Sequence, residues 1–218
     1  MKKFAVIISG QVRTVNRSFL YYLEKININY DVYIHYWSAE NNSYENCGNL
    51  YNRHNIKNVP SNLHDKIIEV YNPKKIIFEN QIIFDFNKNY IDLPTNLMQN
   101  TISQFYGIYK AFNLIDNINN YTHIIKIRFD FKFINFDDNL HDIDNHSLYF
   151  LETNHLNDIL WIVPNNLKHI FSLYNYMYES SNIFNSTPEN IIHFFLSENN
   201  IIPKKINGNC IIDRDYIN

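Results

Sequence analysis

Short apolar runs alternate with stretches of helical spacing along most of this 218-residue chain. The first run, 4–8, is apolar at every position, which is typical of a strand covered on both faces and so of a parallel sheet. Further strands are predicted at 31–35, 75–79, 122–130, 147–151, 159–163, 201–202 and 211–212. The alternation predicts an α/β fold, a largely parallel central sheet flanked by helices, in one domain over 1–218.

Apolar residues at spacings of three to five predict the helices between these runs. The best pattern covers 95–118, and others cover 15–26 and 63–71. Two more are predicted near the end of the chain, over 165–179 with Asn165 as its cap and over 188–198 with Pro188 in its first turn. The segment 37–60 is polar and rich in asparagine, so we interpret it as a long loop, a kind of segment that is often functional.

The chain has four glycines, Gly10, Gly48, Gly107 and Gly208, and no two are close together. Neither G-x-G-x-x-G nor G-x-x-x-x-G-K-[ST] is therefore possible, which excludes the two commonest phosphate-binding loops. Any phosphate would have to be met by side chains or by a metal ion. Gly10, directly after the first strand, is the glycine whose backbone shape can matter to a ligand.

Charge and cysteine content narrow the classes of protein further. The formal net charge is −3, which argues against nucleic acid as a partner. The histidines lack zinc-ligand spacing, and no G-x-S-x-G elbow occurs. Two isolated cysteines favour a reducing compartment, and no apolar run suits a signal peptide or a membrane span. We therefore expect a soluble cytoplasmic protein, with no indication of an oligomeric state.

Ligands of open α/β sheets bind beyond the carboxyl ends of the strands, so the residues there are the candidates for a site. They are Ser9, Gly10, Gln11 and Arg13 after the first strand, His35 and Trp37 after the second, Arg128, Asp130 and Lys132 around the end of the 122–130 strand, and Asn157 and Asp158 before 159–163. We expect these sets to meet along one edge of the sheet.

Each candidate also has a purely structural interpretation. Arg13 suits a phosphate or ribose contact through its planar fork, or is a surface arginine in a loop. Asp130 follows a strand, where a carboxylate can hold a divalent cation against a diphosphate. Strand periodicity puts Arg128, Asp130 and Lys132 on one face, and the structural interpretation of that face is an edge strand with a salt-bridged polar side.

Two later acids are open to the same pair of interpretations. Asp158 suits a general base or an acceptor-binding group, and equally a cap. Glu189 lies in the first turn of a helix, where the helix dipole favours an acid whatever its function.

Six segments, in order, resemble a family of bacterial and large-virus glycosyltransferase-like proteins, similar to those of lipopolysaccharide and surface-glycan clusters. The segments are KFAVIISGQVRT (3–14), DVYIHYW (31–37), QFYGIYKA (104–111), YTHIIKIRFD (121–130), LND (156–158) and TPE (187–189). This family looks like the GT-A glycosyltransferases, which have a Rossmann-like sheet and use no glycine-rich loop. The resemblance implies transfer of a sugar from a nucleotide-sugar donor to a hydroxyl of a glycan or other acceptor.

The resemblance also implies roles for single residues. Asp130 would stand where the Asp-x-Asp motif of GT-A enzymes binds a divalent cation (Mn²⁺ or Mg²⁺) and the diphosphate, and Asp158 would be the catalytic base. The second acid of that motif is Lys132 here, so direct neutralisation of the diphosphate by Arg128 or Lys132, without metal, is the other possibility. Donor-binding residues would be Gly10, Gln11, Arg13, Trp37, Gln104, Arg128 and Lys132, and acceptor-binding residues Asn157 and Glu189. A catalytically inactive nucleotide- or glycan-binding module of the same fold is the alternative.

Overall fold

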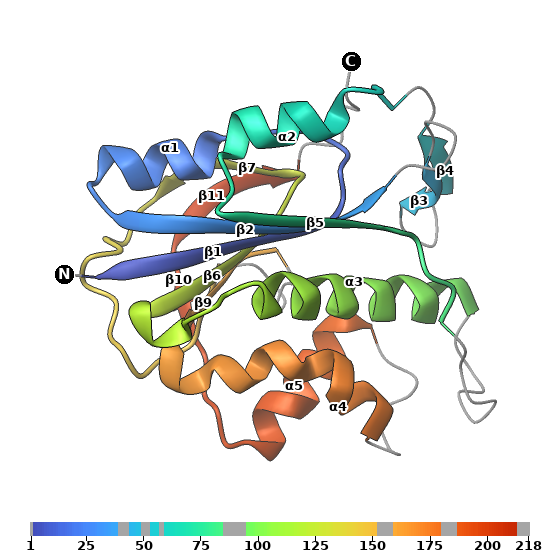
Figure 1. Ribbon diagram of the computed structural model, residues 1–218. Coiled ribbons are helices and arrows are strands. Elements are labelled where there is room, and N and C mark those ends of the chain that lie inside the picture. The colour runs from blue at the N-terminus through green and yellow to red at the C-terminus, as the bar shows by residue number, and fades with distance from the viewer. Residues whose placement is uncertain are drawn as a thin grey trace.

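The computed structural model describes residues 2–38, 44–48, 53–56, 59–84, 95–151, 159–179 and 187–212. The main sheet is built of β1 (Lys3–Gln11), β2 (Asn29–Ser38), β5 (Lys75–Asn80), β6 (His123–Arg128), β8 (Tyr149–Leu151), β9 (Trp161–Pro164) and β10 (Lys204–Ile206). Its strand order is β10-β8-β9-β6-β1-β2-β5, and β9 runs antiparallel to both of its neighbours while all other pairs are parallel (Figure 1). The predicted α/β fold with a largely parallel sheet is confirmed.

Helices cover both faces of this sheet (Figure 1). On one face lie α1 (Ser18–Lys25) and α2 (Leu63–Tyr71), and on the other lie α3 (Thr95–Asn113), α4 (Leu173–Glu179) and α5 (Pro188–Glu198). The 3₁₀ turns are η1 (Ile118–Asn120) and η2 (Asn165–Ser172), the latter leading directly into α4. No helix in the described ranges has the length and apolarity that crossing a membrane requires.

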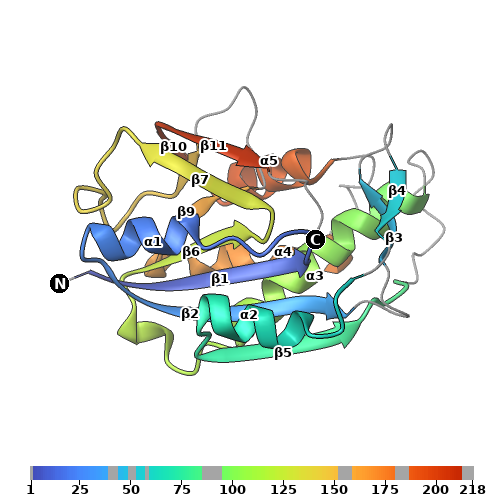
Figure 2. The same ribbon diagram turned by 90° about the horizontal axis from the view of Figure 1, so that it is seen from above.

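Two small antiparallel sheets complete the described fold. One pairs β3 (Tyr44–Gly48) with β4 (Arg53–Ile56), and the other pairs β7 (Phe131–Phe136) with β11 (Gly208–Ile212). The β7–β11 ribbon lies on the same side of the main sheet as α1 (Figures 1 and 2). There Phe19 of α1 makes edge-on ring contacts with Phe131, Phe133 and Phe136 of β7.

Several predicted boundaries are wrong, each for a local reason. The segment 37–60 contains β3 and β4, so it is not one long loop. The helix predicted over 165–179 starts as 3₁₀, and Asn165 does not cap it, because Pro164 holds the cap position and Asn165 is the first helical residue; the Asn165 side-chain amide donates to the Ile118 carbonyl (3.2 Å). The strand predicted at 201–202 begins later along the chain, as β10. Its pairing with β8 starts where the Lys204 N–H donates to the Leu148 carbonyl.

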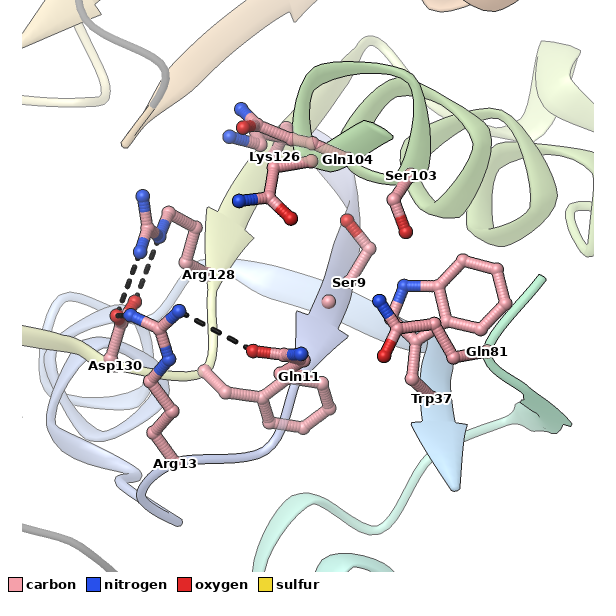
Figure 3. Close-up of a pocket in the computed structure, with 13 residues that line it drawn as sticks. Ser9, Gln11, Arg13, Trp37, Gln81, Ser103, Gln104, Lys126, Arg128 and Asp130 are labelled. Atoms are coloured by element: carbon pink, nitrogen blue, oxygen red, sulfur yellow. Dashed lines mark hydrogen bonds and ion pairs between the residues drawn. The ribbon is translucent and has the colours of Figure 1, made fainter. Parts of the chain in front are cut away.

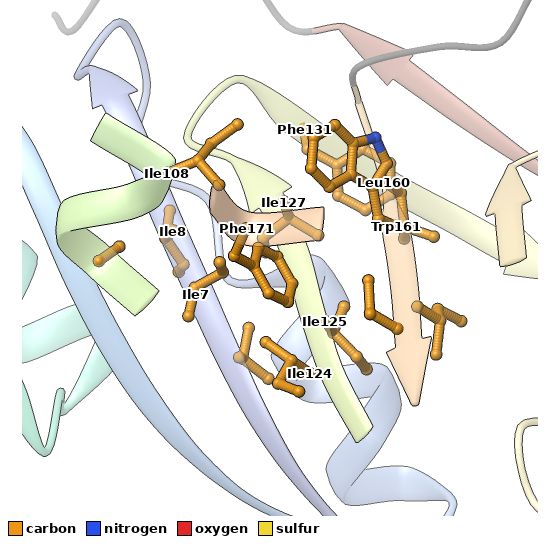
Figure 4. Packing of buried hydrophobic residues seen from close by; sticks show 14 of the residues in the cluster. Ile7, Ile8, Ile108, Ile124, Ile125, Ile127, Phe131, Leu160, Trp161 and Phe171 are labelled. Atoms are coloured by element: carbon orange, nitrogen blue, oxygen red, sulfur yellow. The ribbon is translucent and has the colours of Figure 1, made fainter. Parts of the chain in front are cut away.

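The apolar run 4–8 is covered on both faces, as predicted, and each of its residues is completely buried in β1. Figure 4 shows Ile7 and Ile8 of this strand packed with Ile108 of α3 and Phe171 of η2. Burying an aliphatic side chain of this size contributes about 1.5–3 kcal/mol. This central strand therefore holds the two helical layers together.

Helix α3 approaches the sheet closely at Gly107. A Cβ atom there would lie 3.2 Å from Nδ1 of His35 and 3.6 Å from Cβ of Ser9, so there is little room for a side chain between the helix and β1 and β2. His35 is completely buried, and its Nε2 donates to Glu79 Oε2 (3.0 Å), while Glu79 Oε1 pairs with Lys110 of α3 (2.9 Å). A helix and two strands are thus joined beneath the edge of the sheet.

Burial makes the stability of this fold sensitive to mild acid. Burial lowers the pKa of both His35 and His123 from the usual 6.5, so the folded protein takes up these protons at a lower pH than the unfolded chain does. The unfolded state then binds more protons, and the free energy of unfolding falls as the pH drops from 7 to 5. Urea unfolding at pH 7, 6 and 5 measures this loss.

The His35→Gln variant should show a smaller loss than the original chain over the same pH range. The matched control is His146→Gln, because His146 is exposed, and it should leave the pH dependence unchanged. Equal stability of the original chain at pH 7 and pH 5 would contradict this assignment.

Candidate functional site

A pocket of about 220 Å³ lies at the carboxyl ends of the parallel strands, between them and α3 (Figure 3). Its lining comes from β1 and the loop after it, from β2, β6 and α3, and from the residues that directly follow β5 and β6. These residues are Ser9, Gly10, Gln11, Arg13, Trp37, Gln81, Asn100, Ser103, Gln104, Lys126, Arg128, Phe129 and Asp130. The pocket therefore lies at the edge where the sheet topology predicts a ligand.

Most of the predicted site residues meet in this pocket. Those that line it are Gly10, Gln11, Arg13, Trp37, Gln104, Arg128 and Asp130. Lys132 is exposed on β7 and Glu189 lies in the first turn of α5, and neither lines the pocket. Asn157 and Asp158 lie outside the described residues.

The Asp130 carboxylate is the most constrained charged group in the pocket. Arg128 donates to both of its oxygens, from Nε to Oδ1 and from Nη2 to Oδ2, each at 2.8 Å (Figure 3). Arg13 comes from a different element, and its Nη1 lies 3.6 Å from Oδ2. Asp130 is only 3% exposed, so these charge-assisted contacts operate away from bulk water.

A turn of the chain produces this arrangement. Strand β6 ends at Arg128, residues 129–130 form the turn, and β7 begins at Phe131. The expectation that Arg128, Asp130 and Lys132 share one strand face is wrong, because the turn folds Asp130 back onto Arg128. The buried Phe129 ring fixes the turn against Tyr71 (5.8 Å between ring centroids), and Thr14 Oγ1 donates to the Phe129 carbonyl (3.2 Å).

Lys126 adds a third cation to the lining. Its side chain is 1% exposed, and its Nζ lies 4.9 Å from the centroid of the Trp161 ring on β9. A cation over an aromatic face gains about 0.5–2 kcal/mol, most when desolvated. The sheet thus holds an ammonium group at the pocket two residues before Arg128.

The opposite part of the lining contains a rigid aromatic stack. The Trp37 ring lies parallel to that of Tyr106 in α3, with ring centroids 5.5 Å apart, and edge-on to His35 at 4.9 Å. Because Trp37 is 1% exposed, it shapes the pocket without offering an open ring face to solvent. Gln104 and Ser103 of α3 line the pocket from the helix side.

The described residues do not fit the divalent cation that the resemblance suggests for Asp130. Asp130 is the one carboxylate among the described residues that line the pocket, and guanidinium groups engage both of its oxygens. The nearby charges of Arg13, Arg128 and Lys126 would also repel a cation. Across the described part of the chain, no three His, Cys, Asp or Glu side chains are grouped as a metal site requires.

Some lining residues were not predicted from the sequence. Gln81 directly follows the β5 strand, so the rule applied to the other strands would have selected it. Lys126 is the one charged residue inside an otherwise apolar run, which is a signal for a buried functional group. Asn100 and Ser103 belong to an amphipathic helix pattern and carry no such signal.

No family model and no curated protein matches this sequence. Among solved structures, the apo glycosyltransferase GlyE of Streptococcus pneumoniae TIGR4 is similar at 11% identity and a TM-score of 0.43, covering 91% of this chain and 44% of that one. The cytidylyltransferase LicC of Streptococcus pneumoniae is similar at 14% identity and a TM-score of 0.45, and the match covers 100% of this chain and 95% of that one. Mouse xyloside xylosyltransferase 1 is similar at 8% identity and a TM-score of 0.40, and the match covers 94% of this chain and 85% of that one. With TM-scores this low, no conclusion on activity rests on these likenesses.

Gly10 is the lining residue with an unusual backbone. Its φ is +118°, a conformation that other residues rarely adopt, and a Cβ atom there would meet nothing within 4 Å. Gly10→Ala should therefore lower the free energy of unfolding by about 1–3 kcal/mol through backbone strain alone. Chemical denaturation measures the difference. Ser9→Ala is the control from the same strand. A Gly10→Ala variant as stable as the original chain would contradict the prediction that the backbone conformation at residue 10 is strained for alanine.

Proposed function

We propose that this protein is a glycosyltransferase that moves a sugar from a nucleotide-sugar donor to a hydroxyl of a glycan or other acceptor. One observation carries the proposal. Four segments of the chain that resemble glycosyltransferase motifs, around residues 3–14, 31–37, 104–111 and 121–130, each contribute to the lining of a single pocket. The resemblance rests on the order of these segments along the chain, so their meeting at one pocket is a separate observation that supports it.

The lining suits the chemistry of sugar transfer. The acceptor oxygen attacks the anomeric carbon, a new glycosidic bond forms, and the bond from that carbon to the phosphate oxygen breaks. The bonding electrons leave with the nucleoside diphosphate, and the acceptor proton passes to a base, for which Asp158 remains our candidate if the reaction inverts the configuration. Fixed cations at the leaving diphosphate lower the barrier, because they need no rearrangement as charge develops there.

Asp130 has a positioning role in this proposal. It orients the guanidinium of Arg128, and with it Arg13, toward the donor. Gln11, whose Oε1 accepts from Arg13 Nη2 (3.4 Å), is our candidate for a contact to the nucleotide, together with Gly10, Trp37 and Gln104, which also line the pocket. Asn157 and Glu189 remain candidates for the acceptor. The cation balance of the pocket makes a reaction without Mn²⁺ or Mg²⁺ the version we favour.

The test is donor consumption. The protein is incubated with a panel of UDP-, GDP- and CMP-sugars, and release of the free nucleotide is measured with and without simple sugar acceptors. We expect one donor to be consumed, faster when an acceptor is present. A thermal shift with a nucleotide but no consumption of any donor would favour the binding module over the transferase.

Asp130→Asn should reduce that consumption about 10- to 150-fold, the equivalent of losing a hydrogen bond to a charged group. The matched control is Asp116→Asn, which removes a carboxylate that is 66% exposed and pairs with Lys75 at the surface. Circular dichroism checks that both variants are folded. An unchanged rate in folded Asp130→Asn would contradict the role given to this residue.

A further inference from the structure

We infer that the pocket binds the diphosphate of its ligand directly through Arg13, Lys126 and Arg128, with no divalent cation between them, and that Lys126 is the buried anchor. The inference rests on the proposed function, because a nucleotide-sugar donor is what would bring a diphosphate here. It adds a binding residue, Lys126, and replaces the metal expected from Asp-x-Asp chemistry with three side chains.

The sheet itself fixes the position of Lys126. Strand β6 pairs with β1 on one side and with β9 on the other, and Lys126 lies opposite Ile7 and Trp161. Alternate residues of a strand point to the same face, so Lys126 and Arg128 face the same way, and both line the pocket. The two cations are therefore neighbours by strand geometry, independent of any loop.

Burial strengthens the attraction between Lys126 and an anion in the pocket. A lysine that is 1% exposed has lost nearly all of its hydration, so water screens its charge very little. The Trp161 ring, 4.9 Å from Nζ, offsets part of the desolvation cost of the ammonium group. An anion bound in the pocket would supply further stabilisation, in a setting of low dielectric where the attraction is strong.

The charge of the pocket is complementary to a diphosphate. Among the described residues, three cations and one carboxylate line it, a formal balance of +2 within about 220 Å³. The carboxylate is engaged by Arg128 and Arg13, so it orients two guanidinium groups, whose planar forks suit phosphate oxygens, at the pocket. A divalent cation added to this set would be surrounded by like charges.

The size of the pocket agrees with this ligand. Pockets for whole drug-sized molecules occupy roughly 300–1,000 Å³. The volume here is smaller, about 220 Å³, which suits the diphosphate portion of a nucleotide sugar. Inorganic pyrophosphate is therefore the appropriate probe, because it carries the diphosphate without commitment to any base or sugar.

The experiment is isothermal titration of the full chain with pyrophosphate in EDTA, and again with Mg²⁺ or Mn²⁺. We expect binding in EDTA that weakens as salt is added. Lys126→Met, which keeps the length of the side chain and removes its charge, should weaken binding at least tenfold. Lys25→Met removes an exposed charge at the end of α1, and it should leave the affinity unchanged.

Arg13→Gln keeps the test decisive if Lys126→Met fails to fold, since the Arg13 side chain reaches solvent at 15% exposure. It should also weaken binding about tenfold. Pyrophosphate binding that requires Mg²⁺ or Mn²⁺, or unchanged affinity in folded Lys126→Met or in Arg13→Gln, would overturn the inference.

The outcomes separate the two proposals. Pyrophosphate binding in EDTA without consumption of any nucleotide sugar would leave the anion site standing and count against the transferase. Donor consumption that depends strictly on Mn²⁺ would support the transferase and overturn the direct diphosphate contact.

Discussion

The parallel register of β1 with its two neighbours is the constraint on which the rest of the structure depends. It sets Ser9 opposite both His35 of β2 and Arg128 of β6, so that three strands end together and their last side chains share one edge. Residues 4–8 are buried on both faces and fix β1 in the core, and a slip by one residue would turn the polar side chains that follow them to the opposite face. Apolar packing in the centre of the molecule thus decides which polar groups meet at its edge.

Charge at that edge is organised around the Asp130 carboxylate. A turn places it against Arg128, and Arg13 reaches it from the loop that follows β1. An unpaired carboxylate at 3% exposure would be strongly destabilised, and so would guanidinium groups held in the pocket without a partner. Mutual neutralisation lets the chain keep all three at a concave site, with an excess of positive charge left for a ligand.

Elements with a strong apolar period could be predicted from the sequence, and the others could not. Helix α2 lies where the pattern predicts it, because its buried residues recur at helical spacing, and strand β5 lies at its apolar run. The turn at 129–130 was missed because charged and aromatic residues alternate through it as they do in a strand, and no glycine or proline marks it. Likewise, Asn165 has the residue type of a cap, but Pro164 holds the cap position, and the Asn165 amide donates to a distant carbonyl.

The same limit applies to the candidate site. The carboxyl-end rule selects Gln11, Arg13, Trp37 and Arg128, because it depends only on strand order and direction. It passes over Lys126, which lies inside a strand and reaches the pocket through the direction of its side chain. A charge inside an apolar run marks such a residue in the sequence, but its place at the pocket depends on strand pairing, which also sets Trp161 beside it.

Gly107 has a consequence for the shape of the pocket. It lets the backbone of α3 lie directly against the side chains of Ser9 on β1 and His35 on β2. Gln104, one turn earlier on the same helix, lines the pocket. The absence of a Cβ atom at Gly107 therefore sets the distance between helix and sheet. That distance in turn sets the width of the pocket at Gln104, one turn away. A methyl group added at 107 would push α3 away from the sheet. The pocket would then widen although none of its lining residues had been substituted.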